Sequence, residues 1–178
     1  MLELQTNLIE FDLLNSVSNK NFSSDSIDRD KPSLIMFICN HCPYVIHYHG
    51  EIVKLSIDYN QKINMVAISS NDIIEYPQDS PERMKELWNS LNLSFPYLFD
   101  ETQQIAKKCK AECTPEFYLF NHQNKLEYRG RMDETSPGSD KLPSGKDLRM
   151  AIDNLLSNQP IFKEQLPSMG CNIKWKAN

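Results

Sequence analysis

Residues 34–45 read LIMFICNHCPYV, and this stretch decides the fold. Its first five residues form a continuous apolar run, which is typical of a strand buried on both faces of a mostly parallel sheet. The run leads directly into Cys39, and apolar residues at helical spacing follow from Cys42 to about Tyr59. Pro43 suits the first turn of that helix, because an N–H at this position would lack a partner in any case. The sequence therefore predicts a strand, a Cys-x-x-Cys pair and a helix in immediate succession.

The rest of the chain continues the alternation of strands and helices. An apolar run predicts a strand, and start and stop signals predict three more helices. Two apolar segments joined by a short polar connection predict an antiparallel hairpin. The polar stretch up to Pro32 is expected to be a loop, apart from a strand or short turn within residues 7–14. The C-terminal tail is expected to wrap the surface and to bring Cys171 and Trp175 back onto the core. The expected segments are a strand at 63–68, helices at 81–91, 103–108 and 146–156, hairpin strands at 117–120 and 126–131, and a tail at 158–178.

Bulk composition excludes several classes of protein. The chain has 178 residues, a net charge of −5 and a pI of about 5.4, without a Lys/Arg cluster, so nucleic acid is not an expected partner. No apolar stretch approaches the length of a transmembrane span, and the N-terminus carries no secretory signal pattern, so neither a membrane nor an exported location is expected. The five cysteines are an odd set in a chain large enough to build its own core, which favours the cytoplasm and catalytic, metal-binding or core roles for them.

A Cys-x-x-Cys pair at the start of a helix has a specific chemistry. Unpaired backbone N–H groups and the helix dipole favour a thiolate at the first cysteine of such a pair. Cys39 is therefore the expected attacking nucleophile, and Cys42 the thiol that resolves the mixed disulfide. Asn40 and His41 lie between them, and a protonated His41 would stabilise the Cys39 thiolate and make the couple more oxidising.

Four motifs together resemble the thioredoxin superfamily. More narrowly, they are similar to the peroxiredoxin-like group that includes the alkyl hydroperoxide reductase and thiol-specific antioxidant proteins. The motifs cover nearly the whole chain and are FICNHCPYV at 37–45, ECTPEFYLF at 112–120, YRGRMD at 128–133 and GCNIKWK at 170–176.

The resemblance implies a partner for the dithiol. A cis-proline faces the cysteines in this superfamily, and Thr114-Pro115 occupies the matching place. The residue before that proline then exposes backbone groups that hold a substrate strand over the cysteines. The chain departs from the patterns of these families in two ways. The Pro and the Thr or Ser that precede the peroxidatic cysteine of a peroxiredoxin are missing here. The strand before Cys39 also lacks the buried acid of thioredoxins, and Ser33 stands near the place of that acid. Glu116 is the candidate carboxylate for proton transfer at Cys42.

Other cysteines and an arginine are candidates for supporting or structural roles. Cys113, two residues before the proline, is a candidate third redox thiol or ligand, with a small buried cysteine as the alternative. Cys109 and Cys171 are expected to be inert. Arg131 is preferred over Arg129 as the arginine that pairs with an acid or a substrate.

The sequence thus predicts one α/β domain over residues 1–178, with a thioredoxin-like three-layer α/β/α architecture, a mixed sheet, an N-terminal extension over about 1–32 and a wrapping tail. The predicted function is thiol–disulfide oxidoreduction by Cys39 and Cys42, in redox homeostasis or an antioxidant role, without a bound cofactor. Its partners would be protein or small-molecule disulfides and thiols, with a cellular thiol reductant. One alternative is a thiol peroxidase that uses Cys39, with Cys42 resolving a sulfenic acid. The other is a protein that binds Cu or Zn through Cys39, Cys42 and His41, His47 or Cys113.

Overall fold

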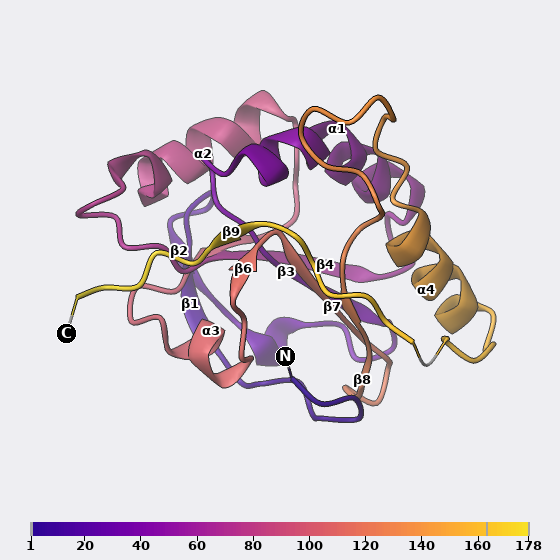
Figure 1. Ribbon diagram of the computed structural model, residues 1–178. Coiled ribbons are helices and arrows are strands. Elements are labelled where there is room, and N and C mark those ends of the chain that lie inside the picture. Colours follow the sequence, from indigo (N-terminus) through magenta and orange to yellow (C-terminus); the bar gives the residue numbers. More distant parts are fainter. Residues whose placement is uncertain (1, 163, 178) are drawn as a thin grey trace.

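Within residues 2–162 and 164–177, which the computed structural model describes, seven strands form one mixed sheet in the order β2-β1-β5-β4-β3-β7-β8 (Figure 1). The central strands β3, β4 and β5 run parallel, whereas β7 and β8 form an antiparallel hairpin beside β3 and β1 pairs antiparallel with β5. The strands of the sheet are β1 Asp12–Asn15, β2 Lys20–Ser23, β3 Ser33–Phe37, β4 Asn64–Ser69, β5 Tyr97–Phe99, β7 Glu116–Phe120 and β8 Leu126–Gly130.

Strand β3 is buried along its whole length, as its sequence predicts. It lies between β4 and β7, and all five of its residues are buried. Leu34 and Met36 face one side of the sheet and Ile35 and Phe37 face the other, so the strand contributes to two separate cores. Each such side chain contributes about 1.5–3 kcal/mol when it is fully buried. The apolar run therefore fixes the position of the residues that follow it, Cys39 included.

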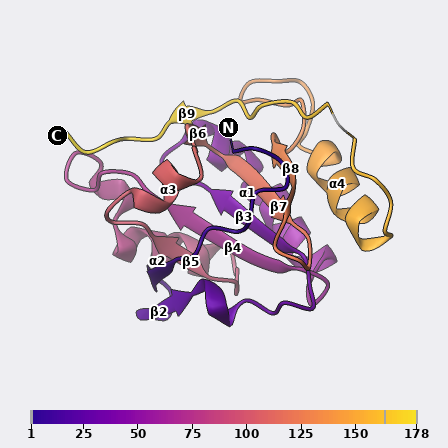
Figure 2. The same ribbon diagram turned by 90° about the horizontal axis from the view of Figure 1, so that it is seen from below.

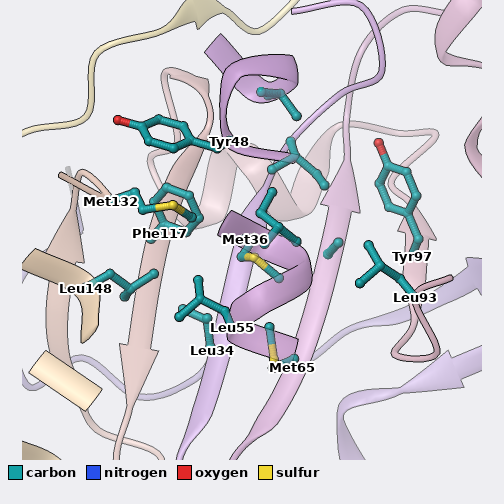
Figure 3. Close-up of a cluster of buried hydrophobic side chains, with 14 of the residues drawn as sticks. Leu34, Met36, Tyr48, Leu55, Met65, Leu93, Tyr97, Phe117, Met132 and Leu148 are labelled. Atoms are coloured by element: carbon teal, nitrogen blue, oxygen red, sulfur yellow. The ribbon is translucent and has the colours of Figure 1, made fainter. Parts of the chain in front are cut away.

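Helices cover both faces of the sheet, but unevenly (Figures 1 and 2). Helix α1 (Pro43–Asp58), α2 (Pro81–Ser90) and α4 (Lys146–Leu156) pack on the face of the larger core, shown in Figure 3. Helix α3 (Gln104–Lys108) packs on the other face together with segments from the N-terminal part of the chain. The 3-10 turns are η1 Ser24–Ser26 and η2 Pro77–Asp79. The predicted helices and the predicted hairpin are confirmed.

Three features of the sheet were not predicted. The polar stretch expected to be a loop contains β2, which is largely exposed and pairs with β1 as an edge strand. Backbone pairing rather than side-chain burial stabilises β2, so its polar sequence lacks the alternation of apolar residues that predicts a strand. Strand β5 is too short, at 3 residues, to show a period. The remaining pair, β6 (Cys113–Thr114) and β9 (Cys171–Asn172), forms a separate small sheet between distant parts of the chain.

The C-terminal tail crosses the molecule and lies beside β6 in both views (Figures 1 and 2). Ile173 is buried in the core on the α3 side, and Cys171 packs against the larger core. Trp175 departs from its prediction and stays 42% exposed, with the Lys107 ammonium 5.6 Å from its ring centre. None of the helices in the described part of the chain is both long and apolar enough to cross a membrane.

Candidate active site

The two cysteines of the Cys-x-x-Cys pair lie where β3 ends and α1 begins. Ile38 still donates its N–H to Ile68 of β4 (3.0 Å), which extends the sheet to the residue before Cys39. Cys42 is the N-cap residue of α1, with Pro43 in the first helical position, as predicted. Both sulfur atoms belong to the larger core, and the residues are only 1% and 0% exposed. The dithiol is therefore a buried pair at a strand-to-helix junction.

A carboxylate holds the turn between the two cysteines. Asp79, fully buried at the end of η2, accepts the backbone N–H groups of Asn40 (2.8 Å) and His41 (3.3 Å) at Oδ1. Its Oδ2 pairs with His41 Nδ1 at 2.7 Å and accepts from Asn71 Nδ2 at 2.8 Å. The Asn40 side chain is fixed in turn by the Tyr97 hydroxyl, which donates to Asn40 Oδ1 at 3.1 Å. We call Asp79, Asn71, Asn40 and His41 the Asp79 network.

His41 has more than one neighbour within this network. Its ring stacks on Tyr76, with centroids 5.3 Å apart and planes 9° apart. Its Nδ1 is directed at the Asp79 carboxylate. The expected effect of His41 on the Cys39 thiolate stays a prediction.

Thr114 faces the dithiol from the opposite side. The Thr114-Pro115 bond is cis, as the resemblance implies. Thr114 Oγ1 lies 3.3 Å from Cys39 Sγ, and the Thr114 carbonyl oxygen accepts from Cys42 Sγ at 3.1 Å. One residue thus contacts both sulfur atoms, one through its side chain and the other through its backbone.

The two thiols titrate as a pair. The hydrogen bond to Cys42 raises the pKa of Cys39 most, and burial and the charge of Asp79 raise it further. The same bond between the sulfurs lowers the pKa of Cys42 to about 4, against the effect of burial. One thiolate is therefore shared by the pair, and the second proton is held tightly.

Within the pair the pKa of Cys42 is lowered and that of Cys39 is raised, which differs from the helix-dipole expectation for Cys39. The reason is where the helix begins: Cys42 is itself the N-cap. Its sulfur forms no capping hydrogen bond, but the backbone N–H of Val45 in the first turn helps to lower its pKa. Cys39 instead lies near Asp79, whose negative charge disfavours a thiolate there.

The tail brings a third cysteine to the dithiol. Cys171 pairs with Thr114 in the β6–β9 sheet. Both its thiol and its backbone N–H interact with the Cys42 sulfur and help to lower the pKa of Cys42. This position was not predicted, because Cys171 was expected to be inert.

Glu116 does not reach the dithiol, contrary to the prediction. Along β7, Phe117 and Leu119 face the core that contains the cysteines, whereas Tyr118 faces the other core. Side chains alternate along a strand, so Glu116 lies on the same side as Tyr118. There it accepts the Glu112 N–H at Oε2 (3.0 Å), and burial raises its pKa. The buried carboxylate beside the cysteines is that of Asp79.

The remaining candidates have separate positions. Arg131 forms an ion pair with Asp147 (Nε–Oδ2, 2.6 Å), so it pairs with an acid as expected, and it also lines a small cavity with Pro115. His47 Nε2 lies 2.9 Å from Thr135 Oγ1, away from the predicted metal ligands. Cys109 is buried in the core on the α3 side.

Cys113 is near the dithiol without facing it. It neighbours Thr114 on β6, so its side chain leaves the strand on the opposite side. Its sulfur lies 4.0 Å from the Pro115 carbonyl oxygen and 3.9 Å from that of Ser168, and burial raises its pKa to about 12.

Part of the predicted metal set does lie together. Among the described residues, ligand atoms of Cys39, His41 and Asp79 fall within 4.8 Å of one another. However, both oxygens of Asp79 already accept two hydrogen bonds each, and two of these come from backbone N–H groups that cannot move away. This arrangement favours a carboxylate that orders the turn over one that binds a metal ion.

The fold and the site define a thioredoxin-fold protein with a dithiol beside a cis-proline. The chain belongs to the AhpC/TSA family, whose profile matches residues 4–129. The expected superfamily, fold and class of oxidoreductase are thereby confirmed at the level of the family. No curated protein sequence matches the chain significantly.

Solved structures agree with this assignment. The chain is 42% identical to an uncharacterized conserved protein from Geobacillus kaustophilus, with a TM-score of 0.96 over 100% of this chain and 95% of that one. A hypothetical protein from Sinorhizobium meliloti 1021 is 35% identical, with a TM-score of 0.96 over 100% and 97% of the two chains. A secreted Mycobacterium tuberculosis disulfide oxidoreductase shares the fold, with 16% identity and a TM-score of 0.62 over 82% of this chain and 96% of that one.

Three residues of the site were missed by sequence reasoning. Asp79 and Asn71 belong to a polar segment between β4 and α2 in which no motif marks them. Cys171 was within a recognised motif, GCNIKWK, but nothing in the sequence indicates that this motif pairs with β6. The preceding Gly170 was the available signal, since glycine allows close backbone approach.

Proposed function

We propose that this protein is a thiol–disulfide oxidoreductase that cycles Cys39 and Cys42 between two thiols and a disulfide. The observation that carries the proposal is the buried pair of cysteines at the junction of β3 and α1, with both sulfurs contacted by Thr114. Such a pair shares one thiolate, which is the reactive form in disulfide exchange. A redox or antioxidant role in the cytoplasm, with disulfides as substrates and a cellular thiol as reductant, belongs to the same proposal.

The arrangement suggests how the reaction starts. When the shared proton is on Cys42, where the Thr114 carbonyl oxygen accepts it (3.1 Å), Cys39 is the thiolate and attacks one sulfur of the substrate disulfide. An S–S bond forms between Cys39 and the substrate, and the other substrate sulfur leaves as a thiolate. Cys42 then gives its proton to that substrate thiolate and attacks the Cys39 sulfur. The bond between Cys39 and the substrate breaks, and the second substrate sulfur leaves as a thiolate that takes up a proton from water. The protein is oxidised to the Cys39–Cys42 disulfide, and the substrate is reduced to two thiols.

The reduction potential of the couple tests the proposal. The protein is equilibrated with glutathione buffers of defined ratio, its thiols are alkylated, and the disulfides are mapped by mass spectrometry. A reversible two-electron transition that links Cys39 to Cys42 is expected in the wild type and in Cys109→Ser, which alters a buried thiol on the other side of the sheet. Its absence from the wild type would contradict the proposal.

The order of attack is tested by trapping. With a disulfide-containing peptide, Cys42→Ser is expected to accumulate a mixed disulfide at Cys39, because the resolving thiol is gone. Cys39→Ser is expected to trap much less peptide on Cys42. If Cys39→Ser trapped the peptide as efficiently as Cys42→Ser, Cys42 would be the attacking thiol instead.

Thiol peroxidase activity is a second candidate, and the family match is the observation that favours it. Cys39 would attack a hydroperoxide, whose O–O bond breaks to release water or an alcohol and leave Cys39 as a sulfenic acid. Cys42 would then attack the Cys39 sulfur, releasing water and forming the disulfide. The apolar residues before Cys39 provide no hydroxyl to orient the peroxide. Consumption of hydroperoxide by the reduced protein, compared with reduction of a model disulfide, separates the two candidates.

A further inference from the structure

The tail closes over the dithiol as a strand. Cys171 and Asn172 pair with Thr114 and Cys113, and Ile173 continues the pairing by donating its N–H to the Glu112 carbonyl oxygen (3.1 Å). The same backbone edge of β6 therefore cannot pair with another chain while the tail is in place. With the tail seated, the two residues of the dithiol are 1% and 0% exposed, whereas Cys171 is only partly buried.

The tail is fitted closely to this position. A Cβ atom added to Gly170 would lie 2.1 Å from the Thr114 carbonyl oxygen and 2.6 Å from its carbon, so glycine is what allows the backbone to pass there. Beyond the strand, Lys174 donates its N–H to Asn71 Oδ1 (2.8 Å), and its carbonyl oxygen accepts from Gln103 Nε2 (2.9 Å). These contacts hold the segment in register with β6.

The register decides which cysteine faces the dithiol. Residues directly opposite each other in a strand pair point to the same side, so Cys171 and Thr114 share one side and Cys113 and Asn172 share the other. Thr114 contacts both active sulfurs, and Cys171, directly opposite Thr114, packs against the core that contains them and helps to lower the pKa of Cys42. The sequence makes Cys113 a candidate third redox thiol, but the strand pairing favours Cys171.

We propose that Cys171 is a third redox-active thiol, which receives the disulfide from the buried pair and presents it to the reductant. This inference rests on the proposed function. Starting from the Cys39–Cys42 disulfide, Cys171 attacks the Cys42 sulfur. The Cys42–Cys171 bond forms, the Cys39–Cys42 bond breaks, and Cys39 leaves with the electron pair and takes up the proton that Cys171 gives up. The exchange involves no net oxidation.

The second step returns the protein to its reduced form. A cellular dithiol attacks the partly exposed Cys171 sulfur, forms a mixed disulfide there and releases Cys42 as a thiol. The second thiol of that reductant then resolves the mixed disulfide. The reductant is oxidised to a disulfide, and Cys171 and Cys42 are both thiols again. The relay lets the reductant attack a partly exposed sulfur while the tail still covers Cys39 and Cys42.

Disulfide mapping of Cys39→Ser tests the relay. After equilibration with oxidised glutathione, this variant is expected to form a Cys42–Cys171 disulfide, and so is Cys39→Ser combined with Cys113→Ser. A variant that carries glutathione on Cys42, or that links Cys42 to Cys113, would overturn the proposal. Serine replaces cysteine with little change in volume, and the backbone pairing of β9 with β6 does not depend on the Cys171 side chain.

A kinetic comparison adds a readout that a structural role would not change. The wild-type Cys39–Cys42 disulfide is expected to be reduced by a small dithiol faster than that of Cys171→Ser, while Cys113→Ser keeps the wild-type rate. Equal rates for wild type and Cys171→Ser would overturn the relay. The two proposals fail separately: a wild type without a Cys39–Cys42 disulfide contradicts the function, whereas a normal Cys39–Cys42 couple without a Cys42–Cys171 disulfide contradicts only the relay.

Discussion

Two regions enclose the dithiol, and they are built in different ways. On one side, the Asp79 network fixes the turn at Asn40 and His41 through four hydrogen bonds to a single buried carboxylate. On the other side, Thr114 and the tail strand β9 cover the sulfurs, and much of that cover is backbone pairing from the end of the chain. Asn71 joins the two regions, because it donates to Asp79 and accepts from Lys174.

The difference teaches how a buried thiol pair can be both positioned and reactive. The Asp79 side contains charge and buried polar groups whose partners cannot be removed without a large cost. The tail side contains a short strand pair, and short segments at chain ends open at low free energy. The Asp79 network therefore sets the geometry of the turn between the cysteines, and the tail sets access to their sulfurs.

Asp79→Ala is expected to have the largest effect. It removes the acceptor of two backbone N–H groups and leaves them buried without a partner, which should lower the free energy of unfolding by about 3 kcal/mol. Because the charge of Asp79 raises the pKa of Cys39, its loss should also lower that pKa. Denaturant unfolding and the pH dependence of Cys39 alkylation measure the two effects. Asp79→Asn, which keeps one oxygen acceptor, should lose less stability. Equal stability of Asp79→Ala and wild type would show that the network does not hold the turn.

Gly170→Ala tests the contact between the tail and β6 and should have the second-largest effect. The added Cβ would overlap the Thr114 backbone, so the tail must lift away from β6. Alkylation of Cys39 and Cys42 should then become faster, with a loss of about 1–2 kcal/mol in stability. Gly50→Ala in α1 is the matched control, because its Cβ would meet no atom within 4 Å. Unchanged alkylation rates in Gly170→Ala would mean that the tail does not limit access.

Thr114→Val should have a smaller effect. The substitution keeps the shape of the side chain and removes the hydroxyl that lies 3.3 Å from Cys39 Sγ. Since this hydrogen bond lowers the pKa of Cys39, its loss should raise that pKa and slow alkylation, at a cost of about 1 kcal/mol. Thr114→Ser retains the hydroxyl and should behave like the wild type. A pKa for Cys39 that stays the same in Thr114→Val would contradict the assigned contact.

Glu116→Gln should leave the dithiol unchanged. Glu116 lies on the far side of β7, so the rates of thiol exchange at Cys39 and Cys42 should match those of the wild type across pH. Its effect should appear in stability instead. Burial raises the pKa of Glu116 in the folded state, so its ionisation weakens the fold as pH rises above the unfolded value of 4.5, and glutamine removes that dependence. A fall in the exchange rate of Glu116→Gln would restore Glu116 as a proton-transfer group.

The sequence by itself determined the strand, the Cys-x-x-Cys pair and the helix that follows it, while the resemblance to the thioredoxin superfamily implied the proline partner of the pair. These features are local or carry a strong pattern: a fully apolar run can only be a buried segment, and the helix must begin next to Cys42 because Pro43 is accepted only in the first turn. The hairpin after Pro115 and the last helix were predictable for the same reason.

Only the tertiary structure decided which groups surround the sulfurs. Asp79 reaches the turn from another loop, Glu116 is excluded by the alternation of β7, and Cys171 arrives through the pairing of two short strands far apart in the sequence. None of these contacts follows from a period or a motif, because each depends on the register of strands brought together by packing. One short motif therefore determines the chemistry of the cysteine pair. The fold determines which charged group, which covering segment and which further cysteine lie next to the pair.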